Sequence, residues 1–184
     1  MLNKYLLSSI FLIFLLSACS ERDSIIKPDD CGKHLFQVLK EFDPHDKEKL
    51  EKNFISLETI HQIGNDKSLI PNKKRRDRYA NMTEQAYQKE IINAAYTIID
   101  NEGYAFSIKW NKIDYVGFVS ENQKFSNLES IKGKLVFEYD DKRYDVGCVY
   151  IRYDKEWKLA AITGIYLHGV NNPKRPQNPS LIEI

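Results

Sequence analysis

Residues 134–167 read KLVFEYDDKRYDVGCVYIRYDKEWKLAAITGIYL, and this stretch decides the fold class. Apolar and polar residues alternate with a period of two over the runs 134–139, 144–153 and 157–167, which is typical of half-buried β-strands. Two charged triplets separate the runs, Asp140-Asp141-Lys142 and Asp154-Lys155-Glu156. Because links this short join antiparallel neighbours, the stretch predicts a three-strand meander.

Two more strands are expected upstream, which makes five in all. A first strand is predicted from the alternation of Tyr104, Phe106, Ile108 and Trp110. Asn111-Lys112 is a tight-turn candidate, and residues 113–119 form the second strand. Residues 121–132 are predicted to be a polar loop that carries Phe125, Leu128 and Ile131.

Helices are expected ahead of the strands. Apolar residues recur at helical spacing from Lys33 to Phe42, and Asp46 and Ser56 each cap a further short helix, the last of which stops at Gly64. The main helix begins at Asn81, with Glu84 placed as in a capping box, and keeps an apolar stripe until Gly103. The fold class is α+β, with short helices and one long helix packed on a curved five-strand antiparallel sheet.

Length and composition fit one globular domain. The chain has 184 residues, of which 42% are hydrophobic and 29% charged, and this excludes a wholly disordered chain. The 27 bases against 26 acids leave a formal net charge of +1. Such a balance gives no global basic field of the kind that binds phosphate backbones, so we expect no nucleic acid partner.

The N-terminus carries an export signal. Residues 1–18 contain Lys4 and then the apolar run 5–16, which is shorter than the roughly 20 residues of a membrane span. The run ends in Leu16-Ser17-Ala18-Cys19, which resembles the lipobox of bacterial lipoproteins. This resemblance implies cleavage before Cys19 and a membrane anchor of diacylglycerol and an N-acyl chain on Cys19. An ordinary signal peptide with a chance cysteine is the alternative.

The residue that follows the lipidated cysteine indicates the membrane to which a lipoprotein is sorted. Ser20 instead of Asp resembles the enterobacterial pattern for sorting to the outer membrane, facing the periplasm, whereas Glu21 and Asp23 leave surface export open. We expect a lipidated tether over 19–31, a single domain over 32–168, and a Pro- and Asn-rich tail over 169–184.

Cys31 and Cys148 are an even pair in an oxidising compartment once Cys19 carries lipid. A disulfide between them would close a loop of roughly 100 residues or more, for which the chain-entropy model gives on the order of 4.7 kcal/mol at most. Two buried thiols are the alternative. The four histidines are scattered along the sequence, so we expect no metal site and no cofactor.

Residues 65–80 lose periodicity and are expected to form a loop. This loop carries five bases in six positions: Lys73, Lys74, Arg75, Arg76 and Arg78. They are candidates for binding an anion, an acidic partner or anionic lipid head groups, the last worth about 1 kcal/mol per base near a membrane surface. A solvated loop is the alternative interpretation.

The order of short helices, one long helix and a meander ending in Asp154-Lys155-Glu156-Trp157-Lys158-Leu159 resembles the nuclear-transport-factor-2-like and cystatin-like α+β superfamily over about residues 32–168. The resemblance implies a curved sheet that wraps a helix to form a cone. Some members are enzymes with an Asp or His acid/base pair in the cone, and many exported members look like binding modules. No residue here matches that pair by motif, although three strand carboxylates could face the cone: Asp114, Glu138 and Asp145.

Three functions are consistent with these features. The first is a lipid-anchored, non-catalytic binding module for a small ligand or protein, with an apolar pocket lined by Tyr and Trp for which Trp110 and Tyr150 are candidates. The second is a periplasmic immunity-type protein that neutralises a toxin through an exposed charged patch. The third is an enzyme of the cone-shaped superfamily, which needs a buried acid or base. The chain has no Gly-x-Ser-x-Gly and no phosphate loop, which favours binding over catalysis.

Overall fold

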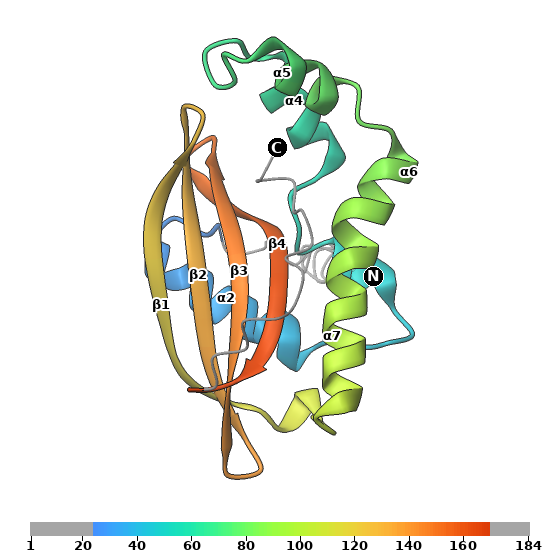
Figure 1. The fold of residues 1–184 in the computed structure, drawn as a ribbon, viewed down its shortest axis with the longest axis vertical. Coiled ribbons are helices and arrows are strands. Elements are labelled where there is room, and N and C mark those ends of the chain that lie inside the picture. Colours follow the sequence, from blue (N-terminus) through green and yellow to red (C-terminus); the bar gives the residue numbers. More distant parts are fainter. Residues whose placement is uncertain (1–23, 170–184) are drawn as a thin grey trace, which may run out of the picture.

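In the computed structural model, which describes residues 24–169, four β-strands form one antiparallel sheet in the order β1-β2-β3-β4 (Figure 1). The strands are β1 (Asp114–Phe125), β2 (Leu128–Tyr139), β3 (Lys142–Tyr153) and β4 (Glu156–Leu167). Each strand pairs with the next along the chain, so the predicted meander is confirmed. The sheet has four strands in the described residues, not the five that we predicted.

Both charged turns predicted from the sequence are present. In each turn two consecutive residues have positive φ, with values of 52° and 57° in the first and 49° and 67° in the second (Asp140, Asp141, Asp154 and Lys155). Such a pair is the mark of a type I′ turn, whose twist matches that of the flanking strands. Each turn is one residue shorter than predicted, because Lys142 and Glu156 already belong to strands.

The predicted polar loop over 121–132 is wrong. These residues are the end of β1 and the start of β2, which pair without interruption from Gly117 opposite Val136 to Phe125 opposite Leu128. Only Ser126 and Asn127 lie between the two strands. The prediction failed because nearly all of β1 is exposed at this edge of the sheet, so its outer half lacks the alternation of a half-buried strand.

The predicted first strand over Tyr104 to Trp110 is also wrong. Helix α7 (Asn93–Ala105) continues past Gly103 and ends in a Schellman motif, in which the N–H groups of Ser107 and Ile108 donate to the carbonyls of Tyr104 and Gly103. Ser107 occupies the left-handed position with φ 55°. A short 3₁₀ turn, η2 (Trp110–Lys112), follows before β1.

Two short helices are capped as the sequence predicts. The side chain of Asp46 accepts from the Lys49 N–H ahead of α3 (Lys47–Glu51), and that of Ser56 accepts from the Thr59 N–H ahead of α4 (Leu57–Asn65). Helix α4 does not stop at Gly64 but ends at Asn65. The glycine serves the packing of α5 instead, since a Cβ at position 64 would lie 2.3 Å from the backbone nitrogen of Ala80.

Helix α2 (Pro28–Lys40) begins earlier than the predicted Lys33, inside the stretch assigned to the tether. Proline fits the first turn of a helix because its missing N–H has no partner there, and Asp29 and Asp30 in that turn complement the helix dipole. Cys31 therefore lies within this helix and not ahead of it.

The basic segment predicted as a loop is helix α5 (Lys73–Ala80). The side chain of Asn72 caps it by accepting from the Arg75 N–H at 3.0 Å. Only Tyr79 is buried in this helix, so it has no apolar stripe that the sequence could reveal.

The long helix is confirmed with a different start. It is built from α6 (Glu84–Tyr87), a π-helical turn η1 (Gln88–Ile92) and α7, which follow one another directly. Its cap is Thr83, whose hydroxyl accepts from the Ala86 N–H at 3.2 Å. Asn81 instead closes α5 by donating to the carbonyl of Asp77.

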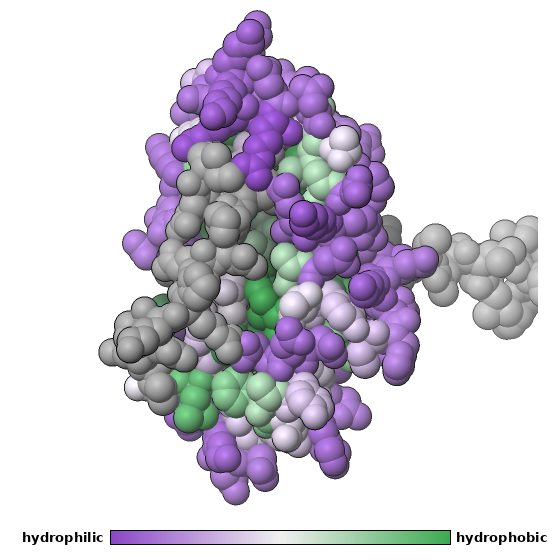
Figure 2. Space-filling model, turned by 45° about the vertical axis from the view of Figure 1, so that its right-hand side comes forward, coloured by the Kyte–Doolittle hydropathy of each residue, from purple (hydrophilic) through white to green (hydrophobic). Residues whose placement is uncertain are grey.

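The core lies between α2 and one face of the sheet. That face carries fully buried side chains from the two central strands: Ile131, Leu135, Phe137, Val146 and Tyr150. Helix α7 packs beside β4, while α4 and α5 sit beyond one end of the sheet (Figure 1). Hydrophilic residues cover that end of the molecule (Figure 2).

Two chain segments cover the start of the outer edge of β4. The Ile55 N–H donates to the carbonyl of Leu159, and the Trp157 N–H donates to the carbonyl of Ile25, both at 2.8 Å. Phe54 forms an isolated parallel bridge with Leu159. The edge beyond β4 is thus occupied by short segments where a fifth strand would lie.

Candidate functional site

A groove of about 830 Å³ lies between α2, the segment from Lys52 to Thr59 and the start of β4. We call it the β4 groove. Its lining is mostly polar and mixed in charge: Asp30, Lys33, His34, Gln37, Lys52, Asn53, Ser56, Thr59, Glu156 and Lys158, with Ser24, Ile25, Phe54, Trp157 and Leu159. A groove of this size is in the range of ligand-binding clefts.

A buried tyrosine positions the histidine of the β4 groove. The Tyr150 hydroxyl donates to the carbonyl of Cys31 at 2.9 Å and lies 2.8 Å from Nδ1 of His34. Because the single hydroxyl hydrogen points to Cys31, the Tyr150 oxygen accepts from the Nδ1–H of His34. Burial raises the pKa of Tyr150 well above its usual value, so this hydroxyl stays protonated.

An ion-paired clasp holds the N-terminal segment to the opposite wall. The Ser24 hydroxyl donates to Glu156 at 2.6 Å, and Lys158 pairs with the same carboxylate. Hydrogen bonding from Lys158, and then from Ser24, lowers the pKa of Glu156. The carboxylate is therefore ionised at neutral pH and fixes the rim of the β4 groove.

The β4 groove presents polar side chains and both signs of charge. It offers three ammonium groups, two carboxylates, two amides, three small hydroxyls and one imidazole. Within residues 24–169, no three His, Cys, Asp or Glu side chains are grouped to hold a metal ion. Such a mixture suits a polar or charged partner that makes several hydrogen bonds.

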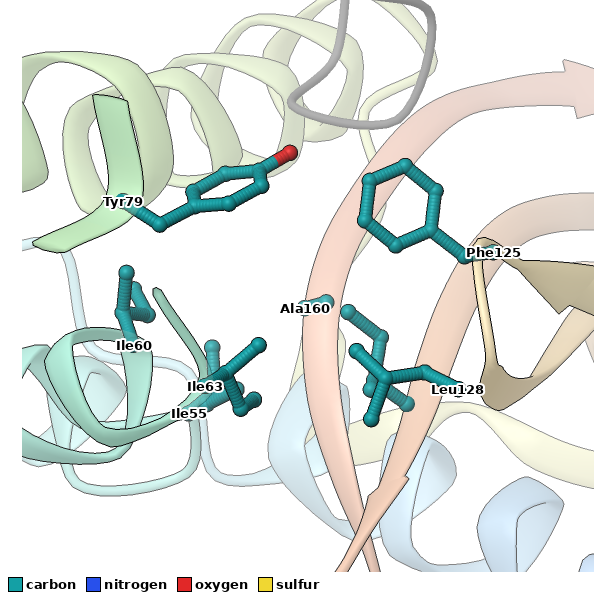
Figure 3. A pocket seen from close by; sticks show the side chains of 8 residues that line it. Ile55, Ile60, Ile63, Tyr79, Phe125, Leu128 and Ala160 are labelled. Atoms are coloured by element: carbon teal, nitrogen blue, oxygen red, sulfur yellow. The ribbon is translucent and has the colours of Figure 1, made fainter. Parts of the chain in front are cut away.

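A second hollow is small and apolar. It lies between α4, α5 and the sheet, has a volume of about 30 Å³, and is bounded by Ile55, Ile60, Ile63, Tyr79, Phe125, Leu128, Ile151 and Ala160. The side chains of Tyr79 and Phe125 face each other across it (Figure 3). This volume is far below the range of ligand-binding pockets, and the lining offers almost no polar group to orient a ligand.

Trp110 and Tyr150 do not form the predicted aromatic pocket. Tyr150 is fully buried beneath His34, while Trp110 packs on Phe137 with ring centroids 5.9 Å apart and on Phe42. Neither residue lines the β4 groove or the apolar hollow. The alternation of the strands showed which face is buried, but not which element covers each residue.

The five bases of α5 divide into two groups. The arginines have structural partners: Arg75 stacks on Phe125, Arg76 donates to the carbonyls of Ile70 and Pro71, and Arg78 pairs with Glu90 at 3.0 Å. Lys73 and Lys74 are exposed, and no residue within 24–169 forms an ion pair with either. Only these two lysines are available to a partner.

Cys31 and Cys148 are both free thiols, fully buried at the interface of α2 and the sheet. Tyr150, which bonds to Cys31, lies two residues from Cys148 on the same face of β3. Burial, and then the charge of Asp30, raises the pKa of Cys31 to about 12, and burial also raises the pKa of Cys148. The disulfide stays a prediction.

The three strand carboxylates lie on the face of the sheet that α2 does not cover. Asp114 and Glu138 are opposite each other in the ladder, Arg143 pairs with Glu138 at 3.3 Å, and Asp145 contacts Lys134 and His168. Glu138 and Asp145 thus form ion pairs on this face, and none of the three carboxylates lines the β4 groove or another hollow described within residues 24–169.

The lipobox, including Cys19, and the tail from residue 170 lie outside the described residues. No helix within residues 24–169 is both long enough and apolar enough to cross a membrane. Comparisons with protein-family models, with curated proteins and with solved structures gave no match for this chain. The class of the protein is defined by its fold and its groove. It is an α+β protein with a four-strand antiparallel meander and a polar groove at its β4 edge.

The sequence did not reveal the β4 groove. Its walls come from three segments far apart in the chain, around residues 24–37, 52–59 and 156–159. Each segment is a short polar stretch at the end of an element, with no motif of its own. The one sequence signal was the Glu156-Trp157-Lys158 hairpin, which we used only for the fold.

Proposed function

We propose that this chain is a lipid-anchored protein of the bacterial cell envelope that binds a polar small ligand or a protein segment in the β4 groove, without catalysis. The observation that carries the proposal is the β4 groove itself, about 830 Å³ in volume and lined mainly by polar side chains. The motif Leu16-Ser17-Ala18-Cys19 supports the anchor, and the outer membrane facing the periplasm is the proposed address.

The state of the nucleophilic side chains supports binding over catalysis. Both buried thiols have raised pKa values, so neither is a thiolate at neutral pH, and Tyr150 stays protonated. The imidazole of His34 is held by Tyr150 in one orientation at the groove wall. An oriented imidazole with amides and ammonium groups around it serves recognition through hydrogen bonds.

The relation to the cystatin-like superfamily is part of this proposal. A helix, α2, that crosses one face of an antiparallel sheet supports it, as does the order of helices before strands. A cone-shaped cavity is the finer part of the proposal, and an enzyme of that superfamily would need its acid or base there.

The experiment is photo-crosslinking in living cells with the full-length chain. A photoreactive amino acid replaces Lys52 inside the β4 groove or, as the control, Lys142 in the turn at the far end of the sheet. We expect a discrete crosslinked species from position 52 that is absent from position 142. The Lys33→Glu variant should weaken that product, whereas Lys112→Glu, an exposed lysine outside the groove, should not.

Equal labelling from both positions, or a product from position 52 that Lys33→Glu leaves unchanged, would contradict groove binding. The identity of the product separates the candidates. An immunity-type function is the second candidate, because the groove presents both signs of charge, as complementary protein surfaces do. A secreted toxin captured at position 52 would establish it in place of a small-ligand role.

A further inference from the structure

The N-terminal segment and helix α5 meet the sheet at the same end. In an antiparallel meander, the end of β1, the start of β2, the end of β3 and the start of β4 share one end. There Ser24 is bonded to Glu156, next to the β3–β4 turn, and Asn127 in the β1–β2 turn donates to the carbonyl of Leu69, just ahead of α5. Two strand spacings, about 10 Å, separate these turns.

A lipid on Cys19 would place this end of the sheet at the membrane. The inference rests on the anchor of the proposed function. Five residues lead from Cys19 to Ser24, a reach of about 17 Å at full extension. Strands of 12 residues, at about 3.3 Å per residue, put the opposite end roughly 40 Å further away. The anchor therefore sets which end faces the lipid.

The same end carries unpaired positive charge. Five exposed lysines lie there without an ion-pair partner within residues 24–169, and we call them the lysine end: Lys67, Lys73, Lys74, Lys124 and Lys155. The nearby acids without an ion pair are Asp77 and Asp154, Asp66, which accepts hydrogen bonds from Ser68, and Glu58 on α4, which accepts from Gln62. The surface there is hydrophilic (Figure 2). Positive charge is thus in excess on the side that the tether leaves.

We propose that the lysine end contacts anionic lipid head groups of the membrane that holds the anchor, with Lys73 and Lys74 of α5 as the central contacts. Each lysine within a Debye length, about 10 Å, of an anionic surface strengthens the association roughly fivefold. The three arginines of α5 are not part of this contact, because their guanidinium groups are engaged within the fold. The contact orients the domain with the β2–β3 turn away from the bilayer.

The test uses the full-length lipidated protein reconstituted in vesicles, either of phosphatidylcholine alone or with anionic phosphatidylglycerol added. A fluorophore is attached to Asp77→Cys on α5 or to Lys142→Cys in the β2–β3 turn, and quenching by a head-group-linked nitroxide is measured. Both sites are exposed, and Cys31 and Cys148 are buried. We expect quenching at position 77 to exceed that at position 142 in both vesicle types, because the anchor holds that end near the lipid, and this excess to grow at least about threefold when anionic lipid is present.

Charge reversal supplies the matched control. Lys73→Glu with Lys74→Glu should abolish the difference between the two vesicle types, whereas Lys109→Glu with Lys112→Glu, exposed at the opposite end, should not. Equal quenching at both positions, or a difference between vesicle types that Lys73→Glu with Lys74→Glu leaves unchanged, would overturn the inference. Neither result would bear on the proposed anchor or on binding in the β4 groove. A chain that lacks the acyl mass on Cys19 would overturn the anchor and this inference with it. A toxin bound through the same two lysines, with no vesicle effect, would assign them to a protein partner instead.

Discussion

Phe118 on β1 lies between α2 and the sheet, in the space that two glycines leave. A Cβ added at Gly32 would lie 2.4 Å from the Cβ of Phe118, and one added at Gly133 would lie 2.4 Å from the far end of its ring. The ring is therefore held from both sides and cannot retreat. These contacts join strands β1 and β2 to helix α2 through one side chain.

Gly133→Ala should lower the free energy of unfolding by about 1–3 kcal/mol, because the new methyl group overpacks a site that also contains the Cys148 sulfur at 2.9 Å. The measurement is urea unfolding at equilibrium. Gly117→Ala is the matched control, since nothing lies within 4 Å of a Cβ at that strand glycine. Similar losses for the two variants would show that glycine is required for its backbone and not for the space it leaves.

At the scale of elements, the end of α7 shows how a helix terminus was mistaken for a strand. Tyr104, Phe106, Ile108 and Trp110 alternate as in a strand, yet Tyr104 is 89% exposed on the last turn of the helix. The Schellman motif uses Ser107 where glycine is usual, so the sequence carried no stop signal after Gly103. The aspartate- and lysine-containing turns and the caps Asp46 and Ser56 were predictable because their residues have strong local preferences.

Ser107→Gly should raise the free energy of unfolding by about 0.5–1 kcal/mol, because glycine adopts the left-handed conformation without the steric cost that serine bears there. Ser107 is exposed, so the change acts through the backbone alone. Ser107→Val, β-branched at the same φ of 55°, should lower it instead. Thermal unfolding of the two variants checks this, and a loss of stability in Ser107→Gly would contradict the Schellman assignment.

At the scale of the whole molecule, the Glu156 clasp links the N-terminal segment to the sheet in a pH-dependent way. Its pKa is lowered in the folded state by Lys158 and Ser24. The stabilisation is therefore fully present above the usual value of about 4.5 and is lost as the pH falls through the lowered folded value. We expect amide exchange at Trp157, whose N–H bonds to Ile25, to speed up in that acid range.

Glu156→Gln should remove this pH dependence. The protection factor of the Trp157 amide, which is its exchange rate corrected for the intrinsic pH dependence of exchange, should then be the same above and below the pH at which Glu156 is protonated. Glu121→Gln, an exposed acid in the middle of β1, is the control and should keep the wild-type profile. If Glu156→Gln leaves the pH profile of Trp157 amide exchange unchanged, the contacts of Glu156 with Ser24 and Lys158 do not hold the N-terminal segment against β4.

The β4 groove could not be predicted from the sequence because it is formed where distant parts of the chain meet. Periodicity identifies the buried face of each element, and the apolar positions of the predicted helix 33–42 and strand 144–153 include the buried residues Leu35 and Tyr150. It does not tell which polar ends meet, and the groove is made by such a meeting of α2, the segment before α4 and β4. The position of α5 at the lysine end could not be predicted either. It follows from the contacts that Asn127 and Phe125 make with the segment before α5 and with Arg75.

Cys31 on α2 and Cys148 on the central strand β3 are both buried in the core, and a disulfide between them would connect two elements far apart in the sequence. If the two form a disulfide in the envelope, Cys31→Ser and Cys148→Ser should each lower the free energy of unfolding by about 2–5 kcal/mol, with little added by the double variant. A reductant should lower the stability of the oxidised wild type and leave the variants unchanged. Urea unfolding with and without reductant measures this. Unequal, additive losses that ignore reductant would show two independent buried thiols, whose raised pKa values then predict slow alkylation in the folded protein.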